Sequence, residues 1–167
     1  EILQLFSIGL AQLNPDGTPQ VDGNGIPVPT YTQDTIIGFA HVFTGWTYPT
    51  KPGATARFFN PEYYVGPMIP FDNHHDTGTK LLLNGATLGA GGTAQADLTA
   101  GLQNIFLHPN VGPFISKQLI QHLVTSNPSP EYVTRITGVF NDNGTAVRGD
   151  MKAVINAILM DPEARRG

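Results

Sequence analysis

The sequence predicts a mainly α fold: an orthogonal helical domain of about five to six helices, with one or two small β-hairpins and a long irregular aromatic-rich loop. Apolar residues recur at helical spacing over residues 93–167, each time behind a residue that favours a helix start. Pairs of Asn or Asp with Gly mark turns in the first part of the chain. Prolines and aromatic residues crowd residues 47–92 without a helical period.

The first 46 residues are expected to form a helix, a hairpin and a second helix. Residues 1–10 carry an apolar face with no capping residue before it, which we interpret as part of a longer chain. Turn signals and alternating polarity predict a small hairpin over residues 14–28. Thr32 is suited to cap the second helix, and Gly45 to end it in a left-handed conformation.

The rest of the chain is expected to be irregular as far as residue 92 and helical beyond it. A second hairpin is predicted around Asn84-Gly85. Helix starts are predicted at five residues that can cap main-chain N–H groups: Thr93, Asn110, Ser129, Asp150 and Asp161. The first of these helices is expected to pack through Leu98, Leu102, Ile105 and Phe106. We therefore expect a single domain over residues 1–167, divided into segments 1–46, 47–92 and 93–167.

Composition and charge exclude several classes of protein. The chain has 167 residues and a net charge of −4, without the basic stripe that a nucleic-acid partner would need. It contains no cysteine, which excludes disulfides, thiolate nucleophiles and cysteine-based zinc sites. No apolar run reaches the roughly 18 residues that a membrane span needs.

The polar stretch at residues 71–80 is the candidate functional site, since it brings two histidines, two carboxylates and a lysine close together in the chain. One mechanism is acid–base chemistry, with His75 as the general base, Asp76 as the carboxylate that orients it and Lys80 completing the site. A carboxylate pair for glycoside hydrolysis is a further alternative, drawn from Glu62, Asp72 and Asp76.

A second mechanism places a divalent metal in the same loop, with four candidate ligands: His74, His75, Asp72 and Asp76. Imidazole and carboxylate together suit Zn, Mn or Fe. The metal would lower the pKa of a bound water, which would then attack the substrate. Ca is a minor candidate because oxygen ligands also crowd together at Asp16, Asp22 and Asn24, which we interpret as turn formers. The cofactor candidates are thus divalent metals: Zn, Mn or Fe through imidazole and carboxylate, and Ca through oxygen ligands.

A purely structural role for the same stretch is the competing interpretation. In it, Asp72 and Asp76 cap turns, and His75 hydrogen-bonds a main-chain carbonyl and pins the loop onto the helices. The other histidines, His41, His108 and His122, are interpreted as structural. His108 is expected at a helix end, where a positive charge would suit the helix dipole.

Several phrases in this order resemble a known family: Glu1-Ile-Leu-Gln-Leu-Phe-Ser-Ile-Gly, Tyr31-Thr32-Gln33-Asp34, Thr44-Gly45-Trp46, His75-Asp76-Thr77-Gly78-Thr79-Lys80, His108-Pro109-Asn110-Val111-Gly112-Pro113-Phe114-Ile115 and Arg148-Gly149-Asp150-Met151-Lys152-Ala153-Val154. Together they resemble the C-terminal half of the bacterial domain-of-unknown-function family numbered 1800. The resemblance implies a mainly helical, exported protein in the periplasm or outside the cell. It brings no established activity. Its recurring His-Asp pair matches His75-Asp76, whereas His74 and His41 lie outside the pattern.

Two functions are predicted from these observations. The first is an exported hydrolase-like enzyme, metal-dependent or not, that acts on a polysaccharide or a small ester and has a pocket at residues 71–80. The alternative is a non-catalytic binding or assembly protein that uses the aromatic loop 58–71 and exposes an apolar patch beside Tyr63 and Tyr64. In either case the N-terminal part of its own chain is an expected partner.

Overall fold

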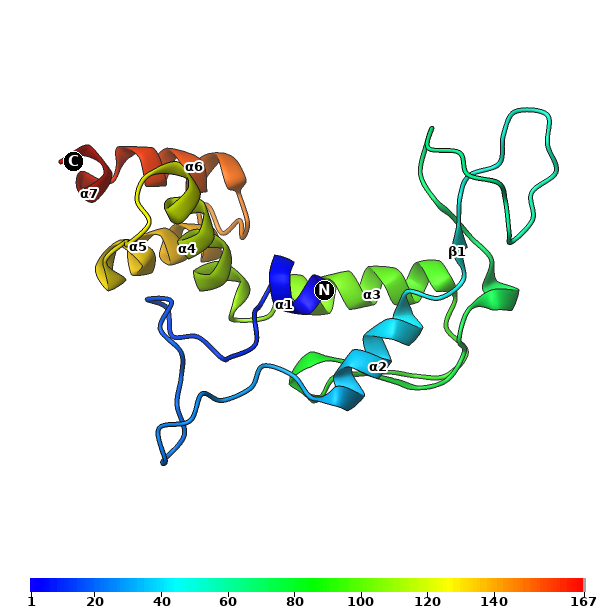
Figure 1. Ribbon diagram of the computed structural model, residues 1–167, viewed down its shortest axis with the longest axis horizontal. Helices are drawn as coiled ribbons and strands as arrows, with labels where there is room; N and C mark the ends of the chain where they lie inside the picture. Colours follow the sequence, from blue (N-terminus) through cyan, green and yellow to red (C-terminus); the bar gives the residue numbers. More distant parts are fainter. Residues whose placement is uncertain (167) are drawn as a thin grey trace. The chain divides into compact units, whose positions relative to one another are not determined.

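Helices make up most of the regular structure in residues 1–166, the part of the chain that this computed structural model describes (Figure 1). Their bounds are α1 Ile2–Phe6, α2 Gln33–Val42, α3 Ala94–Phe106, α4 Val111–Leu123, α5 Pro130–Asn141, α6 Met151–Met160 and α7 Pro162–Arg165. Two small antiparallel sheets accompany them. The mainly α fold with small hairpins is confirmed. Among these helices none has both the length and the apolar character that crossing a bilayer requires.

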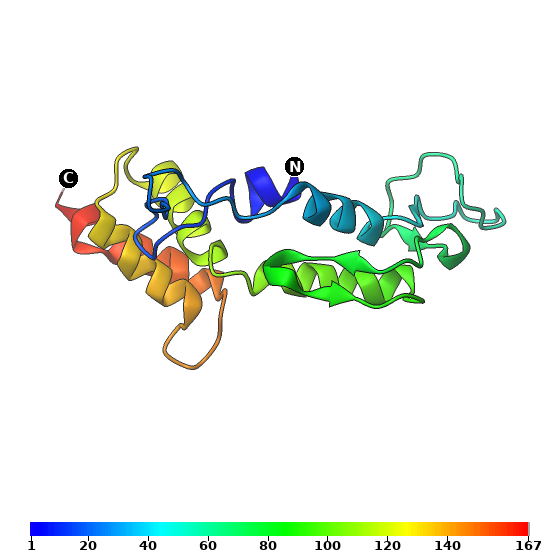
Figure 2. The ribbon, with the colours of Figure 1, turned by 90° about the horizontal axis from the view of Figure 1, so that it is seen from below.

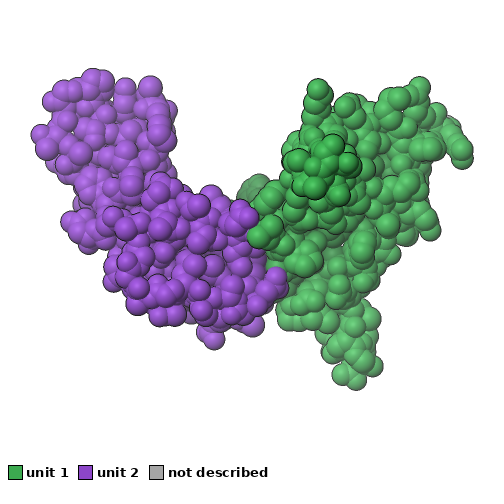
Figure 3. Space-filling model, turned by 180° about the vertical axis from the view of Figure 1, so that it is seen from behind, with its two compact units in different colours: residues 1–30, 105–167 green, residues 31–104 purple. Residues whose placement is uncertain are grey.

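The chain divides into two compact units, which Figure 3 colours separately. Unit 2 is the continuous segment Tyr31–Asn104, whereas unit 1 combines Glu1–Thr30 with the chain from Ile105 onward. These bounds differ from the expected segments 1–46, 47–92 and 93–167. Residues from both ends of the sequence therefore share one unit, and the candidate loop at residues 71–80 belongs entirely to the other.

Unit 1 is built around the mutual packing of α4, α5 and α6. Its buried side chains come from all three helices and from the N-terminal segment: Ile8, Ile120, Tyr132, Val133, Ile136, Phe140, Val154 and Ile158. Tyr132 is fully buried, and its hydroxyl donates a hydrogen bond of 2.7 Å to the carbonyl of Ile158. That bond satisfies the polar end of an otherwise apolar contact between α5 and α6.

Asn110 does not cap α4 with its side chain, so that prediction is wrong. Its main chain is already helical, and its side chain instead binds the N-terminal segment. The amide donates to the carbonyls of Ile8 and Ala11 at 2.8 Å each, and its oxygen accepts from the N–H of Leu13 at 2.9 Å. Because Asn110 is buried, these three bonds fix the segment after α1 against the start of α4.

The expected hairpin at residues 14–28 is reduced to isolated bridges. They pair Ala11 with Pro29, Leu13 with Pro19 and Val21 with Pro27. Each bridge includes a proline, which has no N–H to extend a ladder, and this explains why no continuous strand forms. The turn interpretation of the oxygen-rich residues is supported, since Asp16 and Asp22 accept hydrogen bonds from main-chain N–H groups two to four residues ahead.

The other predicted helix starts are confirmed by their capping hydrogen bonds. Thr32, Thr93, Ser129, Asp150 and Asp161 each accept a bond from a main-chain N–H in the first turn. The end of α2 was predicted less well, because the helix stops at Val42 and Gly45, with φ +80°, lies beyond it.

His108 is structural but does not carry the expected charge. Burial lowers its pKa, and the nearby Arg148 guanidinium lowers it further. Nδ1 instead accepts a hydrogen bond of 3.1 Å from the N–H of Asn110, a role that requires an unprotonated nitrogen. The expectation of a cation at this helix end is therefore wrong.

Helix α3 packs partly through the predicted face and partly through small residues. Ile105 is buried as predicted, whereas Leu102 and Phe106 are exposed, and the other buried positions are Ala94, Asp97 and Gly101. A Cβ on Gly101 would lie only 2.8 Å from Val42 Cγ1, so α3 and α2 approach each other too closely for a larger side chain. Close approach of the two helices thus selects the small residues.

Two short sheets hold the irregular segment of unit 2. Strands β1 (Trp46–Thr47) and β2 (Ile69–Pro70) pair antiparallel and close the long loop between them at its base. Strands β3 (Lys80–Leu81) and β4 (Thr87–Leu88) form the hairpin predicted around Asn84-Gly85, where both turn residues have positive φ. The 3₁₀ turns η1 (Asp72–His74) and η2 (Leu83–Gly85), which were not predicted, lie in the same segment. The β3–β4 hairpin runs along α3 (Figure 2), where Leu83 N–H donates to the side chain of Asn104.

Candidate functional site

The chain around η1 is held against the segment that follows α2 by a close approach at Gly45. The N–H of Phe71 donates to the Gly45 carbonyl at 2.7 Å. A Cβ on Gly45 would lie 3.0 Å from both Phe71 O and His75 Cβ, and its φ of +80° also favours glycine. A residue with a side chain at this position would push the loop outward. The absence of a side chain at Gly45 therefore allows the His75 side chain to be buried.

His75 is bound through both of its ring nitrogens. Nδ1 lies 3.0 Å from the carbonyl oxygen of Thr44 and 3.1 Å from its hydroxyl. Nε2 lies 3.0 Å from Oδ2 of Asp97 and donates to it, because an ionised carboxylate can only accept. The Thr44 hydroxyl in turn donates to His41 O and accepts from the N–H of Asp76. The imidazole thus connects the end of α2 with the first turn of α3.

Lys80 is completely buried and has an acceptor for each of its three N–H groups. Nζ lies 2.8 Å from Oδ2 of Asp97, and it donates to the carbonyls of Asp76 and Gly78 at 2.5 and 3.0 Å. A buried ammonium group is tolerated only when it is paired and fully hydrogen-bonded, and this one meets both conditions. The lysine therefore ties its own loop to α3.

Asp97 binds both His75 and Lys80, and it was absent from the predicted site. Its carboxylate is 7% exposed, and a single oxygen faces both His75 and Lys80. Burial by itself raises the pKa of Asp97, but the hydrogen bonds from Lys80 and His75 outweigh it and hold the pKa below its usual value. A Cβ on Gly92 would lie 2.1 Å from Asp97 Oδ1 and would clash with it. The glycine before α3 therefore leaves room for the carboxylate.

Of the remaining predicted residues, Asp72 and His74 lie apart from this network, whereas the Asp76 carboxylate lies at its edge, 3.6 Å from Lys80 Nζ. Asp72 accepts a 2.9 Å hydrogen bond from Ala94 N–H at the start of α3. His74 stacks on the ring of Phe58 with centroids 3.9 Å apart and planes 7° from parallel. The side chain of Asp76 is partly exposed and accepts from Gly78 N–H, a bond that lowers the pKa of Asp76. The structural interpretation of Asp72, His75 and Asp76 agrees with each of these bonds.

The four proposed metal ligands do not form one ligand set in the structure. Within residues 1–166 no three His, Asp or Glu side chains lie close enough together to hold a metal ion. Both nitrogens of His75 face partners in the chain, and the His74 ring lies against an aromatic ring. Metal binding therefore stays a prediction from the sequence.

The aromatic loop 58–71 presents large apolar side chains to solvent. Phe59 is 80% and Tyr64 75% exposed, with Val65 and Met68 also exposed nearby. The ring of Phe58 anchors this loop, since it contacts His74 on one side and Phe59 at a centroid distance of 4.7 Å. The loop is thus fixed at its base while its outermost rings stay uncovered within unit 2.

Comparison with known proteins identifies the family of the chain. The model of the family described as "Protein of unknown function (DUF1800)" matches residues 1–167. The chain therefore belongs to this family, as its motifs predicted. No curated protein and no solved structure matches it. The family assignment leaves the activity open, so the function has to be argued from the geometry.

Proposed function

We propose that this chain is a non-catalytic, extracytoplasmic binding protein that holds a polysaccharide on its aromatic loop 58–71. The observation that carries the proposal is the exposure of Phe59 and Tyr64 on a loop that is otherwise well anchored. Location outside the cytoplasm rests on the family resemblance. The polysaccharide rests on the chemistry of the loop.

Exposed aromatic rings next to polar groups suit a ligand with apolar faces and polar edges. A sugar ring has that character, because its C–H groups form flat apolar faces and its hydroxyls point outward. Phe59 and Tyr64 offer flat rings, and the exposed Thr55 offers a hydrogen-bonding hydroxyl in the same part of the loop. Tyr48 packs edge-on against Tyr64 at a centroid distance of 5.5 Å and limits its motion, which lowers the entropy lost on binding.

A hydrolase that uses His75 or Lys80 is a weaker proposal, for a physical reason. A general base must come within hydrogen-bonding distance of the proton that it removes. The side chains of His75 and Lys80 are both 0% exposed, and their polar atoms are already bound to Asp97 and to main-chain carbonyls. A substrate would have to displace these bonds before any chemistry began.

The test is binding to soluble polysaccharides by affinity gel electrophoresis, with galacturonan, alginate, xylan and hydroxyethyl cellulose as probes. The variant Phe59→Ser/Tyr64→Ser is compared with the natural chain. Removing two exposed aromatic contacts is expected to weaken binding at least tenfold, about 1.4 kcal/mol or more. The matched control is Phe6→Ser/Leu10→Ser, which removes two exposed apolar side chains from unit 1 and should leave binding unchanged.

Two results would contradict the proposal. One is equal retardation of the natural chain and the Phe59→Ser/Tyr64→Ser variant, and the other is no retardation by any of the four polymers. Hydrolysis of a small ester such as p-nitrophenyl acetate should be measured on the same samples. Hydrolysis that disappears in a folded His75→Asn variant would favour the enzyme instead.

A further inference from the structure

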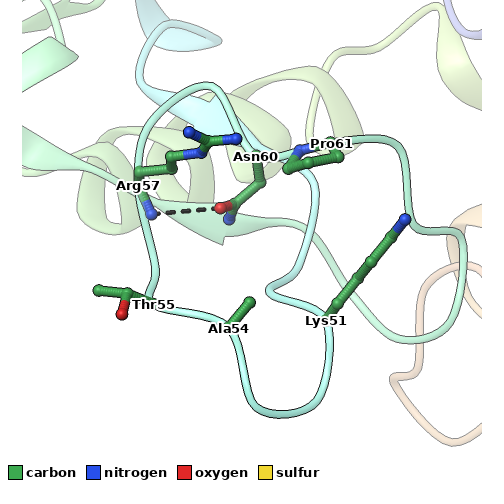
Figure 4. Close-up of a pocket in the computed structure, with 6 residues that line it drawn as sticks. All are labelled: Lys51, Ala54, Thr55, Arg57, Asn60 and Pro61. Atoms are coloured by element: carbon green, nitrogen blue, oxygen red, sulfur yellow. Dashed lines mark hydrogen bonds between the residues drawn. The ribbon is translucent and has the colours of Figure 1, made fainter.

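The long loop between β1 and β2 contains a shallow pocket with two positively charged side chains. The cavity, about 300 Å³ in volume, is lined by Lys51, Ala54, Thr55, Arg57, Asn60 and Pro61. Figure 4 shows these residues around one turn of the chain, with the hydrogen bond from the N–H of Arg57 to the Asn60 side chain crossing it. None of the six lining residues is acidic, so the pocket is positive in a protein of net charge −4.

No ion pair among residues 1–166 neutralises the charge of this pocket. No acidic residue occurs in the sequence between Asp34 and Glu62. Lys51 and Arg57 form no ion pair with any side chain of residues 1–166, whereas Lys80 and Arg135 do. The protein has only nine Lys and Arg residues, and two of them line this one pocket. Such a local positive potential attracts anions even on an acidic protein.

The main chain that carries both cations is fixed by hydrogen bonds. Lys51 begins a tight turn, in which its carbonyl accepts from Ala54 N–H at 3.0 Å and Gly53 has φ +79°. The N–H of Arg57 donates to the buried side chain of Asn60 at 3.2 Å, and that side chain also donates to the carbonyl of Tyr48. Because the main chain at Lys51 and Arg57 is already ordered, binding a ligand there costs little main-chain entropy.

We propose that this pocket binds the anionic groups of an acidic polysaccharide, and that the sugar rings beside them lie on the aromatic loop 58–71. The inference rests on the proposed function and names its ligand class. Arginine offers a planar fork that matches a carboxylate or a phosphate, and lysine adds a mobile point charge. Phe59 lies between Arg57 and the buried Asn60 in the sequence, so the ring and the charge are carried by the same short stretch of chain.

The experiment compares galacturonan with its methyl ester, because the two polymers share a backbone and differ in charge. The measured quantity is the ratio of the two affinities. The natural chain is expected to prefer the acidic polymer at least tenfold at low salt, and to lose this preference as salt screens the charges. In the variant Lys51→Gln/Arg57→Gln the ratio is expected to fall close to one.

A matched control separates the pocket from the overall charge. Lys152→Gln/Arg166→Gln removes two exposed cations from unit 1 and changes the net charge equally. This control should keep the tenfold preference. Loss of the preference in the control would overturn the inference. Equal binding of both polymers by the natural chain would also overturn it, while leaving the aromatic proposal in place.

A titration with single sugars decides the case in which neither polymer binds. Galacturonate and galactose 6-phosphate are added while the Arg57 side-chain N–H resonance is followed by NMR. A saturable shift with either sugar that is lost or weakened in Lys51→Gln, a variant that keeps the Arg57 resonance, supports an anion site and shows which anion it takes, even where polymer binding has failed. No shift with either sugar would overturn the inference.

Discussion

Replacing Asp97 by asparagine tests whether the buried network holds unit 2 together. The amide has the same shape but no charge, so the bonds that Oδ2 accepts from Lys80 and His75 at 2.8 and 3.0 Å lose their charge, and both are lost if the NH2 group takes the position of Oδ2. Hydrogen bonds to charged groups contribute about 1.5–3 kcal/mol each. Breaking a buried ion pair from one side costs about 3–5 kcal/mol. We therefore expect Asp97→Asn to lower the free energy of unfolding by about 3 kcal/mol.

The assay is urea unfolding followed by tryptophan fluorescence. Trp46 is the only tryptophan and lies in unit 2, so its emission reports on the unit that contains the network. With a urea slope of about 1–3 kcal/mol per M, the expected loss moves the midpoint by roughly 1–3 M. Circular dichroism in parallel follows the helices of both units. Asp34→Asn, an exposed acid in the first turn of α2, is the control and should cost less than about 1 kcal/mol.

A double variant makes the reasoning refutable. If Asp97 and Lys80 stabilise unit 2 as a pair, Lys80→Met/Asp97→Asn should cost clearly less than the sum of the two single changes. Additive costs would mean that the pair does not interact in the folded protein. A loss below about 1 kcal/mol for Asp97→Asn would equally refute the view that a buried charge is left without its partner.

Three further changes test other parts of the structure. Gly38→Ala would place a Cβ 1.9 Å from Leu81 O and should cost about 2 kcal/mol or more by the Trp46 assay, whereas Gly138→Ala, with nothing within 4 Å, should be neutral or stabilising. The pKa of His108 lies below its ordinary value of 6.5. As the pH falls below that value, the unfolded chain binds a proton before the folded chain does, and the folded protein loses stability. His108→Asn should flatten this loss of stability on the acid side of the ordinary value, as measured in urea melts followed by circular dichroism. Tyr132→Phe removes a buried bond of 2.7 Å and should lower the thermal midpoint of unit 1 in circular dichroism, with a loss of about 1–2 kcal/mol.

Local signals in the sequence were sufficient for the helices and for one hairpin. Ser129 before a proline and Asp150 before an apolar run are capping patterns that depend on a few neighbouring residues, and both caps form. The hairpin at Asn84-Gly85 depends in the same way on two residues that adopt positive φ. Such elements can be predicted because their causes lie within a few residues of each other.

Contacts between distant residues were beyond the same reasoning. Asn110 looked like a cap, but partners about 100 residues away compete for its side chain and win. Asp97 was passed over because an acid in the first turn of a helix is ordinarily a solvent-exposed partner of the dipole. Its position in a row of small buried residues, with Ala94 and Gly101, is the one sign in the sequence that it points inward.

The division of the chain has a consequence for the order in which the protein folds. Unit 2 is continuous, so all of its residues have been made once synthesis passes Asn104. Unit 1 cannot fold until the rest of the chain has been made, because its helices α4–α7 are synthesised last. Its N-terminal segment is also held by Asn110, and the hydrogen bond between Asn110 and Ile8 joins residues that lie 102 positions apart. During that interval the carbonyl of Ile8 is without its hydrogen-bond partner Asn110. A chaperone that shields this segment on the ribosome would therefore raise the yield of folded unit 1, and slow synthesis beyond residue 104 would lower it. Neither change would affect the folding of unit 2.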